Sequence, residues 1–295
     1  MCASLPSVAQ HTIPVFKGDF DLQGHRGCRG LRPENTLPAF KYAVELGVTT
    51  LELDVVISAD NKVVVSHEPW ISDDICLQVD EKLPFRQVIG QLTYAQISAF
   101  DCGSKRHNRF PEQVNSVASK PLLSKVLTEI RAFADSLDRE IRFSIEIKSK
   151  PKWDGLEQPG PQTAVPLVLN VISASGEFSN SSIQSFDYRV LRLVREVYPE
   201  MKLVCLVEAH NLPFRRSYYR EIESLGFKPD VYSPNALFVS KKLVKRVQAD
   251  GLKLVPWTVN KPERMSKLLR WGVDGLITDY PDRAINLSSV LLNTE

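Results

Sequence analysis

The sequence predicts an α/β protein with the architecture of a TIM (β/α)8 barrel, and three features carry this prediction. Short β-branched segments alternate with longer amphipathic ones over most of the 295 residues, as in parallel sheets with right-handed crossovers. Glycines follow several amphipathic segments, as they do after helices: Gly47, Gly226, Gly251 and Gly272. Such barrels run to about 250 residues or more, so we expect one domain over residues 1–295. An open doubly wound sheet has the same order of elements and stays the alternative.

Nine segments have the composition of strands. They are Asp21–His25, Thr50–Ile57, Lys62–His67, Arg142–Lys148, Ser182–Phe186, Lys202–Val207, Asp230–Ser233, Lys253–Val259 and Gly275–Asp279. Too few residues separate Thr50–Ile57 from Lys62–His67 for a helix to join them. We therefore interpret this pair as a hairpin that extends one barrel strand, which leaves eight β/α units.

Helical periodicity places amphipathic helices between these strands. They lie near Thr36–Leu46, Ser124–Asp138, Ala164–Ala174, Tyr188–Val197, Arg215–Leu225, Lys241–Ala249 and Glu263–Trp271. Either Asn35 or Thr36 is expected to be the N-cap of the first helix.

One long stretch interrupts the alternation. Residues from about 68 to 121 contain a single clear helical pattern, near Thr93–Phe100. Loops of this length are usually functional or form a small inserted unit. We therefore expect an insertion after the second barrel strand, lying over the mouth of the barrel.

Composition excludes several classes of protein. The formal net charge of +2 gives no reason to expect a nucleic-acid partner. No apolar run approaches the roughly 20 residues that cross a bilayer. The five cysteines contain no C-x-x-C pair, which predicts free thiols and neither a disulfide framework nor a zinc site. Ser7-Val8-Ala9-Gln10 resembles the end of a cleaved signal, so a cytoplasmic and an exported location are both compatible with the sequence. The sequence does not specify the oligomeric state.

Carboxylates alternate with apolar residues in two of the expected strands. Glu52 and Asp54 flank Leu53, so both side chains point to the same face of the strand. Adjacent carboxylates among apolar neighbours resist ionisation unless a cation compensates them. Glu146 and Lys148 have the same spacing, and alone they would be read equally well as an exposed ion pair. Together, the three acids predict an all-oxygen site for one divalent cation, Ca²⁺ or Mg²⁺.

Two of the five histidines stand at strand ends, where the active sites of barrels lie. His25 ends the first strand and His67 ends the hairpin. Cleavage of a phosphodiester needs one group to take a proton from the attacking oxygen and another to protonate the departing alcohol. Arg26 has the geometry to bind a phosphate through two hydrogen bonds, although a surface cation would look the same in sequence. Glu34 is a candidate fourth oxygen ligand, or a partner of a ligand.

The ordered set of motifs resembles the glycerophosphodiester phosphodiesterases. It extends from about Leu22 to Arg283 and comprises Gly24-His25-Arg26-Gly27, Pro33-Glu34-Asn35-Thr36, Glu52-Leu53-Asp54-Val55, His67, Glu146-Ile147-Lys148, Gln184-Ser185-Phe186-Asp187, Trp257-Thr258-Val259-Asn260 and Ile277-Thr278-Asp279-Tyr280-Pro281. That family also carries an insertion after the second barrel strand. The chain departs from the family pattern at Glu68, where Asp is common, at Cys28, and at Pro121-Leu122-Leu123-Ser124-Lys125-Val126, where Pro-Thr-Leu-Glu-Glu-Val is usual.

The resemblance implies a TIM barrel that hydrolyses glycerophosphodiesters to glycerol 3-phosphate and an alcohol. It implies metal ligation by Glu52, Asp54 and Glu146, acid–base catalysis by His25 and His67, phosphate contact from Arg26 and Lys148, and a mouth lined by Phe186 and Trp257. The attacker is water or the substrate's own glycerol hydroxyl, and the sequence does not assign which histidine is the acid. The alcohol is not specified either.

Three other functions fit parts of the pattern. A lysophospholipase D or sphingomyelinase D-like enzyme would need an apolar rim, for which Leu83, Phe85, Phe110 and Val114 are candidates, although packing inside the insertion explains them better. A non-catalytic barrel that binds phosphodiesters would not need the histidines. A sugar-phosphate enzyme would usually have a glycine-rich loop near the last strands, where this chain is sparse in glycine.

Overall fold

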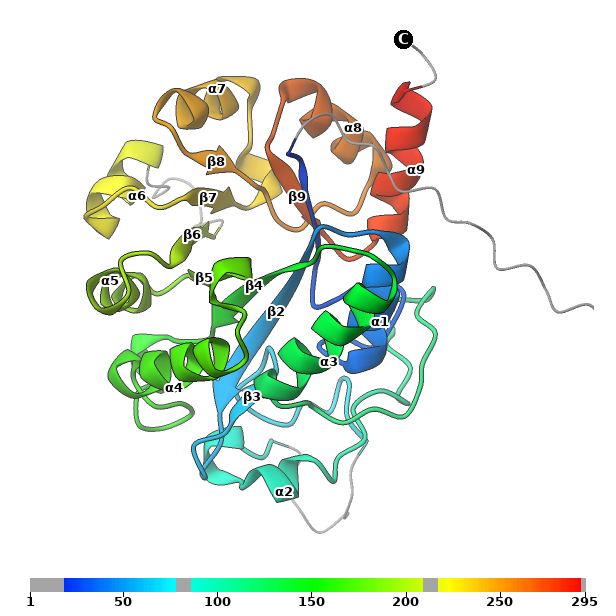
Figure 1. Cartoon of the computed structure of the whole chain (residues 1–295), viewed down its shortest axis with the longest axis vertical. Helices are drawn as coiled ribbons and strands as arrows, with labels where there is room; N and C mark the ends of the chain where they lie inside the picture. Colours follow the sequence, from blue (N-terminus) through cyan, green and yellow to red (C-terminus); the bar gives the residue numbers. More distant parts are fainter. Residues whose placement is uncertain (1–18, 78–85, 209–216, 293–295) are drawn as a thin grey trace, which may run out of the picture.

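The computed structural model describes residues 19–77, 86–208 and 217–292, and side chains up to residue 287. Eight parallel strands form a barrel (Figure 1): β1 (Asp21–Gly24), β2 (Thr50–Ile57), β4 (Arg142–Ile147), β5 (Ser181–Ser185), β6 (Lys202–Val207), β7 (Val231–Pro234), β8 (Lys253–Leu254) and β9 (Gly275–Thr278). Neighbouring strands pair in the order β8-β7-β6-β5-β4-β2-β1-β9. This arrangement confirms the predicted TIM barrel.

Backbone hydrogen bonds between the segment after β8 and strand β9 close the ring. Ile277 N donates to Pro256 O over 3.0 Å, and Val259 N donates to Ile277 O over 2.9 Å. The predicted strand Lys253–Val259 is regular only at Lys253–Leu254, because Pro256 has no N–H to offer a neighbouring strand. These bonds distinguish the barrel from the open sheet that the sequence left as an alternative.

Strand β3 (Val63–Val65) is the second arm of the predicted hairpin. It pairs antiparallel with the end of β2, with Val65 opposite Val55 and Val63 opposite Ile57. It lies off the path of the eight barrel strands. The prediction that this segment extends one barrel strand is therefore confirmed.

Helices surround the strands (Figure 1). They are α1 (Leu37–Leu46), α3 (Leu123–Ser136), α4 (Pro161–Ala174), α5 (Tyr188–Val197), α6 (Tyr218–Leu225), α7 (Lys241–Ala249), α8 (Pro262–Trp271) and α9 (Pro281–Leu292). The sequence analysis missed α9, although Pro281 at its first position and Asp282 in its first turn are typical helix starts. None of the helices in the described ranges is long and apolar enough to cross a membrane.

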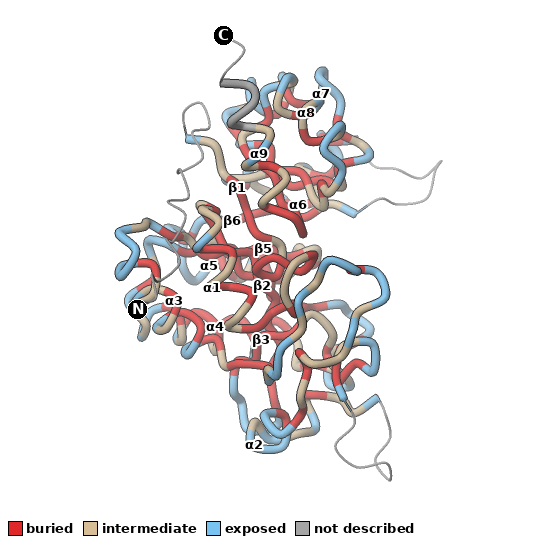
Figure 2. Tube along the Cα trace, turned by 90° about the vertical axis from the view of Figure 1, so that its right-hand side faces the viewer, coloured by how far each residue is buried: buried red, intermediate tan, exposed pale blue. Residues whose placement is uncertain are grey.

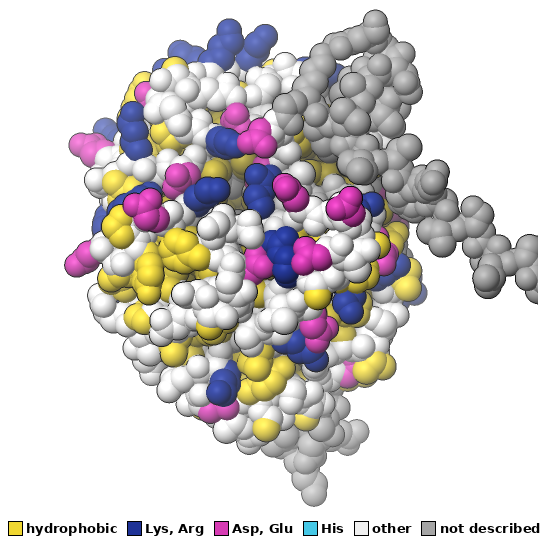
Figure 3. All heavy atoms as spheres, in the orientation of Figure 1, with side chains coloured by type: hydrophobic (Ala, Val, Ile, Leu, Met, Phe, Trp, Pro, Cys, Tyr) yellow, Lys and Arg dark blue, Asp and Glu magenta, His cyan; other side chains and the backbone are white. Residues whose placement is uncertain are grey.

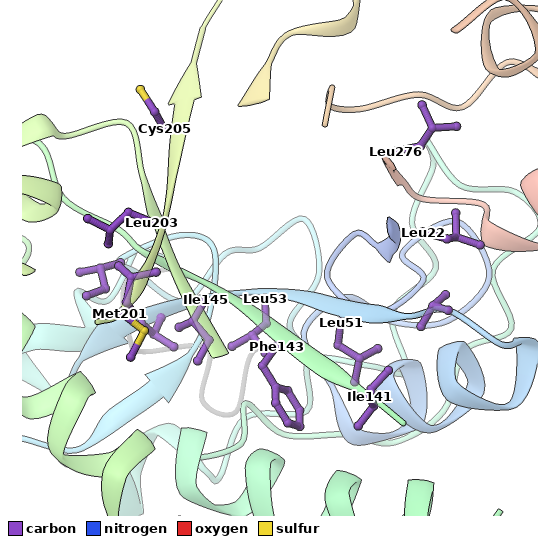
Figure 4. Packing of buried hydrophobic residues seen from close by; sticks show 14 of the residues in the cluster. Leu22, Leu51, Leu53, Ile141, Phe143, Ile145, Met201, Leu203, Cys205 and Leu276 are labelled. Atoms are coloured by element: carbon purple, nitrogen blue, oxygen red, sulfur yellow. The ribbon is translucent and has the colours of Figure 1, made fainter. Parts of the chain in front are cut away.

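The hydrophobic core lies between the strands and the helices. Figure 2 shows the strands mostly as buried, whereas the helices carry exposed residues as well. Residues on the outward faces of neighbouring strands pack there against the helices (Figure 4), among them Leu22, Leu51, Leu53, Phe143, Ile145, Leu203 and Leu276. Because side chains alternate along a strand, the residues between these leucines and isoleucines point into the barrel. Those inward residues are largely polar, and they build the site described below.

The insertion has a small core of its own. Buried side chains from the hairpin and from the segment after it pack together: Val56, Val64, Ile71, Cys76, Ile89, Ile97, Phe100 and Cys102. A short helix, α2 (Tyr94–Ile97), lies where the sequence predicted one, and Thr93 and Gln96 form a capping box at its start. These contacts make the described part of the insertion a packed unit rather than a loose loop.

A disulfide joins Cys76 to Cys102 inside the insertion, so the prediction of free thiols was wrong for these two residues. They are 26 residues apart and carry no spacing motif, and only the folding of the insertion brings them together. Cys28 and Cys205 are free and buried, as predicted. Cys2 lies outside the described residues.

The disulfide predicts a measurable contribution to stability. Closing a loop of this length should stabilise the protein by about 2–4 kcal/mol, mainly by restricting the unfolded chain. We expect Cys102→Ser to lower the denaturation midpoint and Cys205→Ser, at a buried free thiol, to leave the cross-link intact. Peptide mapping without reductant should recover Cys76 bound to Cys102. Recovery of both cysteines as free thiols would contradict the assignment.

Candidate active site

Strand register brings three carboxylates together inside the barrel. In the parallel pair β2 and β4, Asp54 lies opposite Glu146, and Glu52 lies opposite Ser144 one step earlier. All three acids are buried. One oxygen from each of Glu52, Asp54 and Glu146 lies within 4.8 Å of the others. The structure thus brings together the three ligands that the sequence predicted, and their oxygen-only donor set suits a hard divalent cation.

The protein's own charges compensate this carboxylate trio only in part. Burial and the nearby Asp54 raise the pKa of Glu52 well above its usual value. Burial, again with Asp54 close by, raises the pKa of Glu146 to about 7. Burial also opposes ionisation of Asp54, yet the charges of His67, Arg26 and Lys148 hold its pKa below the usual range. Such competition among buried acids is relieved when a cation binds between them.

Lys148 lies against the trio rather than in the open cavity. Its Nζ is 2.8 Å from Glu146 Oε1 and 3.6 Å from Asp54 Oδ1. The side chain is buried. Of the two interpretations that the sequence allowed, the ion pair with Glu146 is therefore present, and it lies inside the barrel instead of on an exposed face.

His25 is held by a buried carboxylate from the far end of the chain. Its Nδ1 lies 2.6 Å from Asp279 Oδ1, and its Nε2 lies 3.9 Å from Glu52 Oε2. Asp279 also accepts hydrogen bonds from Arg29 Nε (3.0 Å) and Asn260 Nδ2 (2.6 Å). Burial lowers the pKa of His25 to about 4, although Asp279 opposes the shift. Because an ionised carboxylate only accepts, Nδ1 carries the proton and Nε2 turns its lone pair towards the trio.

His67 has a similar arrangement beyond the end of the hairpin strand β3. Its Nδ1 lies 2.6 Å from Glu68 Oε1, so the residue that departs from the family pattern supplies the carboxylate. Burial, with Lys148 and Arg26 nearby, lowers the pKa of His67. Its side chain is 28% exposed, against 12% for His25. His67 is thus the histidine closer to solvent.

The turn after β1 holds Arg26 against the acids. The Arg26 backbone N donates to Glu52 Oε2 over 2.8 Å, and its Nη1 donates to Glu34 Oε1 over 2.7 Å. Gly24 and Gly27 make the turn possible, since a Cβ on Gly24 would lie 2.0 Å from Gly27 O, and Gly27 has a φ of +86°. Glu34 pairs with arginines and is not part of the carboxylate trio.

The residues before α1 have separate tasks. Thr36 caps the helix by accepting from Ala39 N, which resolves the choice left open by the sequence. Asn35 instead donates from Nδ2 to Asp54 Oδ2 over 2.9 Å and accepts from Asp54 N. It adopts a left-handed conformation, with a φ of +56°, which asparagine tolerates better than most residues.

A cavity of about 580 Å³ opens over these groups at the carboxyl end of the strands. Eight of the nine predicted site residues line it: His25, Arg26, Glu52, Asp54, His67, Glu146, Phe186 and Trp257. Lys148 does not. The rings of Phe186 and Trp257 meet edge to face with 5.2 Å between centroids. The predicted residues thus lie together, and the roles assigned to them stay predictions.

Sequence reasoning missed the residues that orient the site. Asp279 and Asn260 hold His25, and Gln184 donates from Nε2 to Glu52 Oε1 over 2.7 Å. All three lie in motifs noted in the sequence analysis. A single polar residue at a strand end, however, does not indicate which other residue it will contact. Lys120 was also missed: it is buried behind His67, with Nζ 2.9 Å from Ser66 Oγ.

Sequence comparison places this site in a known family. The model of the Glycerophosphoryl diester phosphodiesterase family matches residues 25–283. A glycerophosphodiester phosphodiesterase of Caldanaerobacter subterraneus is 30% identical over 269 residues, which cover 89% of this chain and 95% of the relative. A rat protein named lysophospholipase D is 23% identical over 274 residues, covering 88% of this chain and 83% of its own length.

Solved structures share the fold. A putative glycerophosphoryl diester phosphodiesterase from Silicibacter pomeroyi superposes with a TM-score of 0.82 at 28% identity, covering 92% of this chain and 94% of that one. A phosphodiesterase from Oleispira antarctica, solved in complex with the product sn-glycerol-3-phosphate, superposes with a TM-score of 0.73 at 20% identity, covering 91% and 96%.

The raised pKa values in the trio predict that cation binding depends on pH. Metal binding requires ionised carboxylates, and Glu146, with a pKa of about 7, is mostly protonated at pH 5. Ca²⁺ or Mg²⁺ should therefore raise the melting temperature more at pH 8 than at pH 5. Comparing samples with and without metal at each pH removes the pH dependence of the melting temperature that is common to both, such as that from the histidines. Glu146→Gln should weaken the effect, and an equal shift at both pH values would contradict it.

The Asp279 carboxylate predicts a positioning role for that residue. Asp279→Asn should preserve the shape but allow His25 to adopt the wrong tautomer. We expect kcat to fall by roughly tenfold or more while KM changes little, because the imidazole is misoriented rather than removed. Asp282→Asn, three residues later in α9, is the matched control. Unchanged kcat in a folded Asp279→Asn protein would refute the role.

Proposed function

Because the chain belongs to the glycerophosphoryl diester phosphodiesterase family, we propose that it cleaves glycerophosphodiesters to glycerol 3-phosphate and an alcohol by metal-assisted acid–base catalysis. In this proposal Glu52, Asp54 and Glu146 hold one divalent cation, Ca²⁺ or Mg²⁺. His25 and His67 move the protons. The observation that carries the proposal is the pair of carboxylate-held histidines that line the same cavity as the buried trio.

The cation and the side chains around it would have different roles in binding the phosphate. A divalent ion bound by the trio would neutralise it and polarise a phosphate oxygen. Arg26 lines the cavity beside that position and presents a cation to the phosphate. Lys148 is buried against Glu146 and Asp54, so we assign it to fixing these ligands rather than to direct phosphate contact. Gln184 and Asn35 fix the other two acids.

The environments of the two histidines suggest which is the base. The pKa of His25 is lowered to about 4, so this imidazole is neutral and can accept a proton from the attacking oxygen. Burial lowers the pKa of His67 as well, but the Glu68 carboxylate favours its protonated form, and its side chain is more exposed than that of His25. We therefore assign His25 as general base and His67, in its protonated form, as general acid. Either water or the glycerol hydroxyl serves as the attacking group in this scheme.

A lysophospholipid is the second candidate substrate, and the apolar side of the cavity favours it. Phe186, Leu206, Leu237 and Trp257 line that side, and Leu237 is 81% exposed. The rim that the sequence suggested is different: Phe110 is buried, Val114 does not line the cavity, and Leu83 and Phe85 lie outside the described residues. An acyl chain attached to glycerol would bury the exposed leucine.

Removing either histidine tests the mechanism. We expect His25→Ala and His67→Ala each to lower kcat on glycerophosphocholine by about a hundredfold to ten-thousandfold, and EDTA to abolish wild-type turnover until Ca²⁺ or Mg²⁺ is restored. The same assays on lysophosphatidylcholine rank the two substrate classes. Circular dichroism and melting curves check that the variants fold. Full activity in either variant, or indifference to EDTA, would reject the mechanism.

A further inference from the structure

The wall of the active-site cavity combines apolar and cationic side chains. Apolar side chains line it at the ends of β5 to β8. Among the cations that line it, Arg109 comes from the insertion and Lys261 precedes α8. The carboxylates that line the cavity are Glu52, Asp54, Glu146 and Asp279, and all are buried. The solvent-facing part of the described lining therefore carries positive charge without acidic side chains to balance it.

The backbone that carries Arg109 is fixed at the mouth of the barrel. Phe110 is buried, with its ring 4.7 Å from the Arg29 guanidinium and 6.4 Å from the Tyr280 ring. Gln113 Nε2 donates to Arg29 O over 2.7 Å. These contacts attach the insertion to the loops after β1 and β9, beside the residues that hold His25. Arg109 is thus presented to the cavity by an anchored segment.

The Arg109 side chain has no acidic partner among the described residues. It is exposed and lies over the Phe110 ring, 5.7 Å from the centroid, and no described carboxylate forms a salt bridge with it or with Lys261. The nearby acid Glu112 is engaged by Arg283, whose Nη1 also donates to Asn260 O over 3.1 Å. Arg283 therefore ties the insertion to the loop that carries Lys261. Both cations line the same cavity.

We propose that this enzyme prefers glycerophosphodiesters whose leaving alcohol carries its own negative charge, such as a second phosphate, and that Arg109 and Lys261 bind that charge. This inference rests on the proposed function. All such diesters share the same uncharged glycerol. Arg109 and Lys261 can therefore distinguish one diester from another only by the charge of its leaving alcohol. A guanidinium binds a phosphate through two hydrogen bonds, and the ammonium adds a second cation. The same charges repel a cationic alcohol such as choline, which the aromatic side of the cavity would otherwise accommodate.

Three substrates and three variants test the proposal. We would measure kcat/KM for glycerophosphoinositol, glycerophosphoinositol 4-phosphate and glycerophosphocholine at low and high salt. The wild-type enzyme should prefer the phosphorylated inositol diester over its neutral counterpart by about 1.5-fold to fivefold, as expected for an exposed charge pair, and salt should reduce that preference. Arg109→Glu should abolish or reverse the preference. Arg106→Gln, at an exposed arginine of the same segment that does not line the cavity, should leave it unchanged.

The outcomes separate this inference from the proposed function. Absence of turnover on all three diesters would overturn the proposed function itself. Turnover with equal or better use of glycerophosphocholine would overturn only the charge preference. An equal loss on all three diesters in Arg109→Glu would place Arg109 on the scissile phosphate and likewise overturn the assignment to the alcohol. Loss of the phosphorylated substrate's advantage in Arg109→Glu and Lys261→Glu, but not in Arg106→Gln, supports it.

Discussion

The confinement of three carboxylates in one buried space is the constraint on which the rest of the site depends. Asp54 and Glu146 are register neighbours on adjacent strands, and Glu52 precedes Asp54 on the same face. Unpaired buried charges are costly, so each acid needs a partner. Gln184 supports Glu52, Asn35 supports Asp54 and Lys148 supports Glu146. These partners leave the trio short of positive charge, and its oxygen-only donor set suits a divalent cation.

The same constraint explains the division between a polar interior and an apolar exterior. The strands place Leu51, Leu53, Phe143, Ile145 and other large apolar residues outward against the helices, where they form the core. The inward face is thereby free to carry acids at the carboxyl ends of β2 and β4. The His25 pair with Asp279 joins the first and last barrel strands, so closing the ring also assembles the catalytic geometry. A break in that closure would cost both stability and function.

Much of this could be predicted from local patterns, and the exceptions have physical reasons. Because side chains alternate along a strand, the sequence predicted that Glu52 and Asp54 share a face and that Glu146 points inward. Gly47 likewise indicated where α1 ends. The roles of Asp279 and Lys120 could not be predicted, because their partners are distant in sequence and no periodicity marks them. The Cys76–Cys102 bond was missed for the same reason. Lys148 illustrates a third case: local pattern singled out the residue but could not decide between contact with the phosphate and an ion pair with Glu146.

The most direct test of the account is a crystal structure of the protein grown with Mn²⁺ or Ca²⁺, with the ion located by anomalous scattering. The account predicts one ion, with oxygens of Glu52, Asp54 and Glu146 at coordination distances of roughly 2.0–2.6 Å, and His25 and His67 on opposite sides of it. An ion bound elsewhere, or a trio that stays paired with Lys148 alone at saturating cation, would contradict it.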